Sequence, residues 1–193
     1  MRKIIAYLAT SADGFIARPN GAVDWLDRPR VPGDYGMARF YRTVDTMVMG
    51  RKTWDVGRKL GARIDAAKTT YVFSRKRRRS AVPGVVFVDE PIPRFAQRLR
   101  HARGKHIWLM GGADLLAGFL DADQLDELII NVVPSLIGAG IPLLAPRRRI
   151  VPLRLVACRR FTDGVVRLHY LIERSAPTRG SSSPSRRSRP SRP

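Results

Sequence analysis

Three segments carry polar, basic or glycine residues of the kinds that can bind phosphate. They are Met49-Gly50-Arg51-Lys52-Thr53-Trp54, Tyr71-Val72-Phe73-Ser74-Arg75-Lys76 and Trp108-Leu109-Met110-Gly111-Gly112-Ala113-Asp114-Leu115. Each follows an apolar run expected to be a strand, and two of them then open a helix. Free N–H groups at a helix N-terminus favour phosphate, and glycine lets the phosphate approach the backbone. Each of these segments alone is also compatible with an ordinary turn or loop, but together they outline the anionic groups of NADPH.

The basic residues suggest how the phosphates are divided among the segments. Arg51 and Lys52 add positive charge at the first turn. Ser74, Arg75 and Lys76 could hold the extra phosphate that distinguishes NADP from NAD, because arginine binds phosphate through two parallel hydrogen bonds. The Gly111-Gly112 pair does not complete the G-x-G-x-x-G fingerprint, so a standard Rossmann site is not indicated.

The remaining reactive side chains give weaker signals. Asp13 precedes Gly14 and is either simple turn chemistry or a catalytic or substrate contact. His101, His106 and His169 are dispersed and show no metal spacing, so no metal site is expected. Cys158, the only cysteine, is expected to be an inert core thiol in a strand. Trp25 and Trp54 could line a cleft, whereas Trp108 is expected in the core.

The composition favours one compact domain with a strongly basic surface. The 193 residues carry a formal net charge of +20, with 30 Arg against 6 Lys. This field would attract phosphates, nucleotides or nucleic acid. Since the basic residues are scattered, dedicated nucleic-acid binding is the less favoured alternative. No apolar run is long enough to span a membrane, and a single cysteine suits the cytoplasm.

The hydrophobic pattern alternates strands with helices, which predicts an α/β fold with a mostly parallel sheet. Expected strands cover Lys3–Ala9, Thr46–Met49, Thr69–Phe73, Val85–Val88, His106–Met110 and Leu128–Val133. Expected helices cover Asp34–Val44, Thr53–Leu60, Ile92–Arg103 and Asp114–Leu120, with Asp34 as an N-cap. Leu153–Phe161 and Val165–Ile172 flank Thr-Asp-Gly, a hairpin signal that adds an antiparallel edge. The globular domain is 1–174, and the Ser/Arg/Pro tail at 175–193 is expected to be disordered.

Five motifs in order resemble the dihydrofolate reductase-like family, most closely the C-terminal reductase domain of bacterial bifunctional riboflavin deaminase-reductases. Met49–Trp54 is similar to "MGRxTW", Ser74-Arg75 to the adenosine-phosphate strand end, and Met110–Ala113 to the glycine pair, often joined by a cis peptide. Ser11–Ala17 resembles "S-x-D-G-x-I-A", and Pro134–Gly140 resembles "P-x-L-x-G-x-G". The likeness runs from about Lys3 to Ile172.

The resemblance implies a three-layer α/β/α fold with about eight strands and an NADPH site across the strand ends. In that family Ala9 and Ile16 would border the nicotinamide. Gly50–Thr53 and Gly111–Leu115, which include Ala113 and Asp114, would hold the phosphates, and Ser74, Arg75 and Lys76 the adenosine end. Tyr7, Trp25 and Phe40 would contact a small heterocyclic or ring-opened sugar substrate. The expected activity is NADPH-dependent reduction; a nucleotide-binding domain without turnover is a further alternative.

One departure from the family concerns the proton donor. Dihydrofolate reductase carries a carboxylate four residues before the helical aromatic, and counting back from Phe40 gives Gly36. Asp34 lies nearby but is expected to cap the helix. Folate reduction is therefore not expected, and water or Asp13 would supply the proton. Apolar residues on the final hairpin would suit a homodimer.

Overall fold

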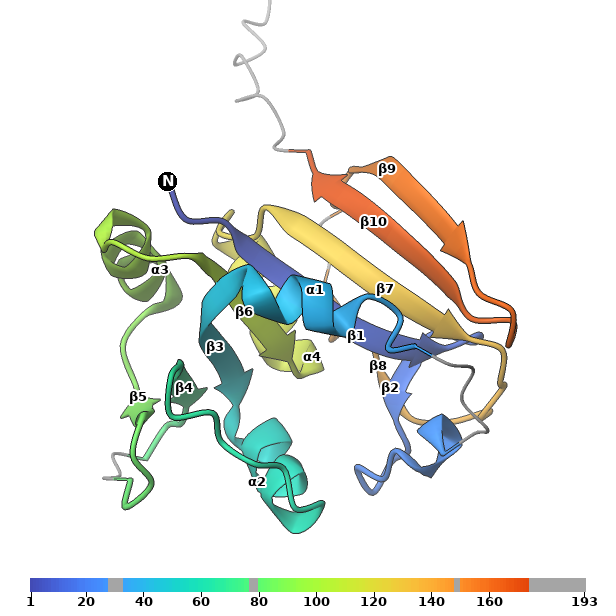
Figure 1. Cartoon of the computed structure of the whole chain (residues 1–193), viewed down its shortest axis with the longest axis horizontal. Coiled ribbons are helices and arrows are strands. Elements are labelled where there is room, and N and C mark those ends of the chain that lie inside the picture. The colour runs from blue at the N-terminus through green and yellow to red at the C-terminus, as the bar shows by residue number, and fades with distance from the viewer. Residues whose placement is uncertain (28–32, 77–79, 148–149, 174–193) are drawn as a thin grey trace, which may run out of the picture.

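The chain forms a three-layer α/β fold around one eight-stranded sheet, seen in the computed structural model, which describes residues 1–27, 33–76, 80–147 and 150–173. The sheet consists of β1 (Ile4–Ser11), β3 (Val44–Gly50), β4 (Thr69–Phe73), β5 (Val85–Val88), β6 (His106–Gly111), β7 (Glu127–Val133), β9 (Leu153–Arg160) and β10 (Val166–Ile172). The helices are α1 (Met37–Arg42), α2 (Arg51–Lys59), α3 (Ile92–His101) and α4 (Ala113–Asp121). In Figure 1, α1 lies in front of the sheet, and α3 and α4 lie behind it.

The strands lie in the order β5-β4-β3-β6-β1-β7-β10-β9. The six strands from β5 to β7 pair in parallel, as expected where helices form the crossovers. β10 is antiparallel to both β7 and β9. The tight turn before β10 contains Gly164 at φ +88°, a conformation that glycine adopts without strain. The predicted mixed sheet with an antiparallel hairpin is confirmed.

The core is divided by the alternation of side chains along the strands. Ile4 and Ala6 of β1 pack with Phe95 of α3 and Phe119 of α4. Ile5 and Tyr7 face the other way and pack with Phe40 of α1, Met47 and Trp108. The expectation that Trp108 is a core residue is confirmed.

The helix expected at Asp34–Val44 is shorter than predicted. Tyr35 and Gly36 have positive φ angles, 54° and 80°, which a helix does not accommodate, so α1 begins at Met37. The Asp34 carboxylate still accepts hydrogen bonds from the amides of Gly36, at 2.9 Å, and Ala38. At the other end, Val44 belongs to β3 rather than to the helix.

Three further features were not predicted. β2 (Phe15–Ala17) pairs with β8 (Ile141–Pro142), and a 3-10 turn, η1, covers Asp24–Leu26. Cys158 is exposed, so its expected place in the core was wrong: every residue of β9 is exposed, and none of them belongs to the described hydrophobic clusters. No helix in the described ranges is long and apolar enough to cross a membrane. The predicted tail at 175–193 lies outside the described residues.

Candidate cofactor and substrate site

The two glycine turns lie side by side. β3 and β6 are neighbours, and Met49 is the register partner of Gly111. A Cβ atom built on Gly50 would lie 3.7 Å from the amide nitrogen of Gly112 and 3.8 Å from the carbonyl oxygen of Gly111. The turns therefore face each other across a narrow gap that is lined in part by the backbone of Gly50, Gly111 and Gly112. The Gly111-Gly112 peptide bond is cis, as the family resemblance implied.

Each glycine turn leads directly into a helix N-terminus. α2 starts at Arg51 and α4 at Ala113, and the residues that precede them, Gly50 and Gly112, provide no capping side chain. The first-turn amides of both helices therefore lack the side-chain acceptor that usually satisfies them, and they favour an anion. Backbone amides of Ala113, Asp114 and Leu115 belong to this first turn.

Thr53 and Ile16 complete the gap between the turns. A Cβ built on Gly112 would lie 3.5 Å from the Thr53 hydroxyl oxygen and 3.8 Å from Cδ1 of Ile16. Ile16 comes from β2 and packs against Ala113 and Ala117 of α4. Residues from three separate parts of the chain thus meet at the same two turns.

The third basic segment lies at the same edge of the sheet. β4 pairs with β3 on the side away from β6, and Phe73 is the register partner of Gly50. Ser74 follows immediately, and its hydroxyl donates to the Lys76 carbonyl over 3.1 Å. Arg75 and Lys76 are exposed, so their cations reach the solvent beside the glycine turns.

The first-turn cations of α2 have different surroundings. Arg51 donates from Nε to both carboxylate oxygens of Asp55, each at 2.8 Å, and its guanidinium lies 5.6 Å from the Phe87 ring centroid. Lys52 is exposed. Arg51 is therefore held along its own helix, whereas Lys52 remains available at the edge.

A pocket of 360 Å³ opens between α1 and strands β1, β7 and β10. Tyr7 and Phe40 both line it, and their rings pack edge to face with centroids 4.8 Å apart. Ala9 follows two residues after Tyr7, on the same face of β1. The expected substrate residues Tyr7 and Phe40 are thus brought together beside Ala9.

Trp25 is placed differently. It is 6% exposed and packs with Val133, Val165 and Ala9, and it is not among the residues that line the 360 Å³ pocket. Trp54 of α2 is also buried, packed with Met49, Val72 and Val85. Trp25 therefore packs against Ala9 in the core and does not line the pocket.

Asp13 connects two loops. Its carboxylate accepts hydrogen bonds from the amides of Ile137, at 3.1 Å, and Gly138, at 2.7 Å. The Ser11 hydroxyl and these two amides hold the pKa of Asp13 below its usual range. The carboxylate is therefore ionised at neutral pH and ties the β1–β2 turn to the loop at 134–140. An ionised carboxylate has no proton to donate.

Arg167 is one of the pocket residues that the sequence patterns did not single out. It donates from Nη1 to the Tyr35 carbonyl over 2.8 Å. A Cβ atom on Gly36 would collide with this same Nη1. No local sequence signal predicts this contact, because Arg167 lies on β10 and Gly36 lies far away in the sequence, just before α1. Only the alternation of side chains along β10 could have indicated which face of the sheet carries Arg167.

Glu127 is the acidic residue that lines the pocket. Its Oε1 accepts from Lys3 Nζ at 2.6 Å, and its Oε2 lies 2.8 Å from His169 Nε2. Burial raises the pKa of Glu127, but Lys3 and His169 outweigh this effect and hold it below its usual range. The carboxylate is therefore ionised and fully paired. Among the described residues, no group of three or more His, Cys, Asp or Glu is placed to hold a metal.

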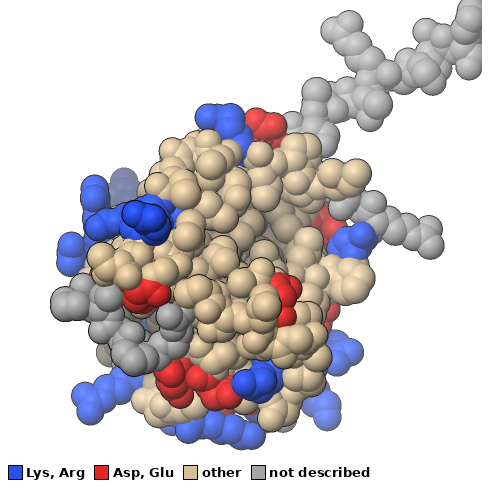
Figure 2. Space-filling model, turned by 90° about the vertical axis from the view of Figure 1, so that its right-hand side faces the viewer, with Lys and Arg blue, Asp and Glu red and all other residues tan. Residues whose placement is uncertain are grey.

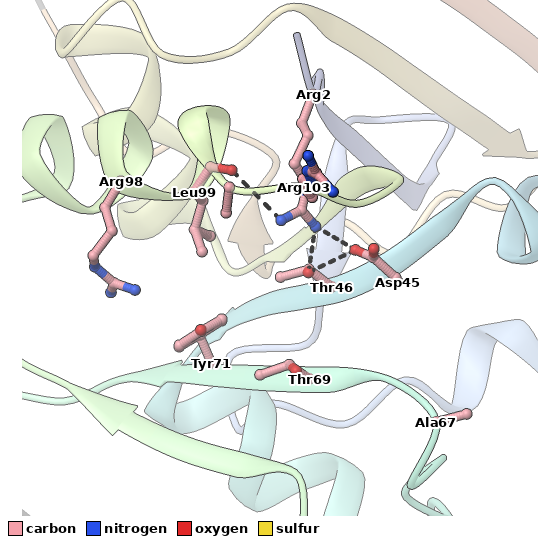
Figure 3. A pocket seen from close by; sticks show the side chains of 10 residues that line it. Arg2, Asp45, Thr46, Ala67, Thr69, Tyr71, Arg98, Leu99 and Arg103 are labelled. Atoms are coloured by element: carbon pink, nitrogen blue, oxygen red, sulfur yellow. Dashed lines mark hydrogen bonds and ion pairs between the residues drawn. The ribbon is translucent and has the colours of Figure 1, made fainter.

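A second pocket, of 330 Å³, lies at the opposite, amino-terminal ends of the strands (Figure 3). Arg2 uses several of its N–H donors within the protein. It donates to the Lys105 carbonyl and the Thr46 hydroxyl, each at 2.6 Å, and forms an ion pair with Asp45. In open α/β sheets ligands gather at the carboxyl ends of strands. The edge formed by the glycine turns is therefore the candidate site.

Comparisons with known proteins agree with this geometry. The protein YwjB of Bacillus subtilis (strain 168), described as uncharacterised, is 39% identical over 171 residues, covering 88% of this chain and 98% of that protein. The crystal structure of a putative riboflavin biosynthesis protein from Shewanella sp. PV-4 superposes with a TM-score of 0.80 at 26% identity, covering 89% of this chain and 99% of that one.

The fold is also that of dihydrofolate reductase. The enzyme from Enterococcus faecalis, solved with NADP(H), superposes with a TM-score of 0.62 at 15% identity, covering 89% of this chain and 97% of the enzyme. The family model described as "RibD C-terminal domain" matches residues 2–167. The chain therefore belongs to the RibD C-terminal domain family.

Proposed function

We propose that the protein is a cytoplasmic NADPH-dependent reductase that acts on a small heterocyclic or ring-opened sugar substrate, similar to 5-amino-6-(5-phosphoribosylamino)uracil reductase. The observation that carries the proposal is the pairing of two uncapped helix N-termini across the gap between Gly50 and Gly112. A riboflavin biosynthesis assignment of the Shewanella protein and the NADP(H) complex of the Enterococcus enzyme support it.

The residues present fit the phosphates of a dinucleotide. The three glycines at the turns place no side chain in the gap, so an anion can reach the amides of both helices. Thr53 supplies a hydroxyl there, and Lys52, Arg75 and Lys76 supply charge along the same edge. When bound, NADPH supplies a hydride. Ala9 and Ile16 would then border its nicotinamide, and the pocket beside Tyr7 and Phe40 would hold the acceptor.

The proton comes from water in this proposal. Asp13 is held ionised by its loop contacts, and position 36 carries no side chain. The described part of the pocket therefore offers no protonated carboxyl. Tyr7 donates its hydroxyl proton to the Tyr35 carbonyl at 3.0 Å, so this hydroxyl serves to fix the loop before α1.

The decisive experiment is a fluorescence titration of the purified protein with NADPH and with NADH. We expect NADPH to bind much more tightly, because only NADPH carries the phosphate for Arg75. Binding of neither nucleotide would contradict the proposal. Tight NADPH binding without oxidation in a screen of ribosylaminopyrimidines, dihydrofolate and small carbonyls would instead indicate a nucleotide-binding domain without turnover.

The protein also acts as a homodimer in this proposal, through β9. Leu153, Leu155 and Val156 on this edge strand are 41%, 51% and 42% exposed. Figure 2 shows that most of the face on the β9–β10 side is uncharged, with Lys and Arg near its margin. An unpaired edge strand with exposed apolar side chains favours association with another copy.

A further inference from the structure

A guanidinium takes the place of a side chain at the start of α1. Gly36 stands four residues before Phe40, where the family resemblance would put a carboxylate. A Cβ atom there would collide with Nη1 of Arg167. Arg167 also lines the 360 Å³ pocket. The pocket therefore presents a positive charge at the position where a carboxylate would present a negative charge.

The sheet register places Arg167 two strands away from Ala9, which is expected to contact the cofactor. Ala9 of β1 pairs with Asn131 of β7, and Asn131 pairs with Arg167 of β10. Neighbouring strands lie about 4.7–4.9 Å apart, so the Ala9 and Arg167 backbones are about 10 Å apart. Asn131 stands between them on the same face of the sheet, so a planar ring stacked over Asn131 would be within hydrogen-bonding reach of the flexible arginine side chain.

The charged and titratable side chains of the pocket offer more hydrogen-bond donors than acceptors. Arg39, Arg167, His106 and His169 line it together with one acid, Glu127. Both Glu127 oxygens are already engaged, by Lys3 and His169. Arg167 has five N–H donors and uses Nη1 for the Tyr35 carbonyl; its guanidinium has no other hydrogen bond or ion pair with the part of the chain that the structure describes.

We propose that Arg167 recognises the substrate by donating hydrogen bonds to an acceptor oxygen. The pocket then takes planar molecules that present a carbonyl or carboxylate, and it rejects the protonated aminopyrimidine edge that a carboxylate would bind. Its volume suits one such ring, since small-molecule pockets start near about 300 Å³. The inference rests on the proposed function only in placing the substrate beside the nicotinamide.

The test compares two planar probes of opposite polarity, orotate and 2,4-diaminopyrimidine, by calorimetric titration of the full chain with and without NADP⁺. We expect orotate to bind at least tenfold more tightly. Arg167→Met should weaken orotate at least tenfold, and Arg167→Glu should reverse the preference. Arg42→Met removes the same charge from α1, outside the pocket lining, and it should leave the preference within twofold.

The outcomes separate this inference from the proposed function. Preference for 2,4-diaminopyrimidine, binding of neither probe, or an equal effect of Arg42→Met and Arg167→Met would overturn the role of Arg167. Because the first two outcomes are read from the unmodified protein, the test does not depend on the variants folding. Selective orotate binding without any NADP⁺ or NADPH binding would contradict the reductase proposal while leaving the recognition intact.

Discussion

Met49 at the end of β3 lies opposite Gly111 at the end of β6. This register brings two turns, more than sixty residues apart in the sequence, to the same edge of the sheet. The helices that follow, α2 and α4, therefore direct their N-termini at one place. Their partial positive charges add to each other there, which neither turn would achieve alone.

Gly50→Ala tests the gap between these turns. The new methyl group would lie 3.7 Å and 3.8 Å from backbone atoms of Gly112 and Gly111, ordinary contact distances, so the fold should tolerate it. The methyl group occupies the space proposed for the pyrophosphate. We expect NADPH affinity to fall about tenfold or more, or about 1.4 kcal/mol, with an unchanged circular dichroism spectrum.

Gly57→Ala is the matched control. Gly57 lies within α2, and a Cβ there would contact the Ala62 side chain at 3.7 Å. Replacing a helical glycine by alanine should stabilise the protein by about 0.5–1 kcal/mol. NADPH affinity should not change. An equal loss of affinity in both variants would show that the gap is not the pyrophosphate site.

Arg75→Ala tests discrimination between the two nucleotides. The exposed guanidinium after β4 should contact the phosphate that NADH lacks. Its loss should weaken NADPH by about 1–3 kcal/mol and leave NADH unaffected. Arg103→Ala removes an equally exposed arginine at the far end of the strands and should change neither affinity. An unchanged NADPH-to-NADH affinity ratio in Arg75→Ala would exclude this residue as the selector.

Much of the fold was predictable because local patterns agree with the tertiary structure. β4 and β5 have the predicted bounds, Thr69–Phe73 and Val85–Val88. Buried strands between helices read clearly as apolar β-branched runs. β2 and β8 were missed because a pair of three and two residues leaves no periodicity to detect.

The site residues, too, could be predicted from the sequence only in part. The glycine turns could be found in the sequence, since glycine before a helix has a local cause. Arg167 could not, because its role depends on contacts with Tyr35 and Gly36 that only the assembled sheet creates. Cys158 shows the converse error: an apolar strand predicts burial, but the side chains of β9 meet none of the described hydrophobic clusters and are all exposed.

Asp13→Asn tests whether this residue is structural. Its folded-state pKa is depressed, so the ionised carboxylate stabilises the fold above the unfolded-state pKa of about 3.9. That contribution is lost as the pH falls through the folded-state pKa. We expect urea unfolding to show the variant less stable at pH 7 and the difference to vanish in acid below the folded-state pKa. NADPH affinity should be retained.

Asp27→Asn removes one exposed carboxylate as a control for net charge. Its stability should follow the unmodified protein across the same pH range. If Asp13→Asn were as stable as the unmodified protein at pH 7, the loop contacts to Ile137 and Gly138 would contribute nothing measurable, and a role for Asp13 in contacting substrate would regain support.

Leu155→Arg tests the proposed dimer. Leu155 is 51% exposed on β9, and an added charge at the centre of an apolar interface is left without a partner when the interface closes. Sedimentation velocity should show a dimer for the unmodified protein and a monomer for the variant. Val86→Arg makes the same kind of change on β5, the opposite edge strand, where Val86 is 44% exposed. That variant should remain dimeric, since any second copy pairs through β9; dissociation of both variants would indicate a general charge effect rather than this interface.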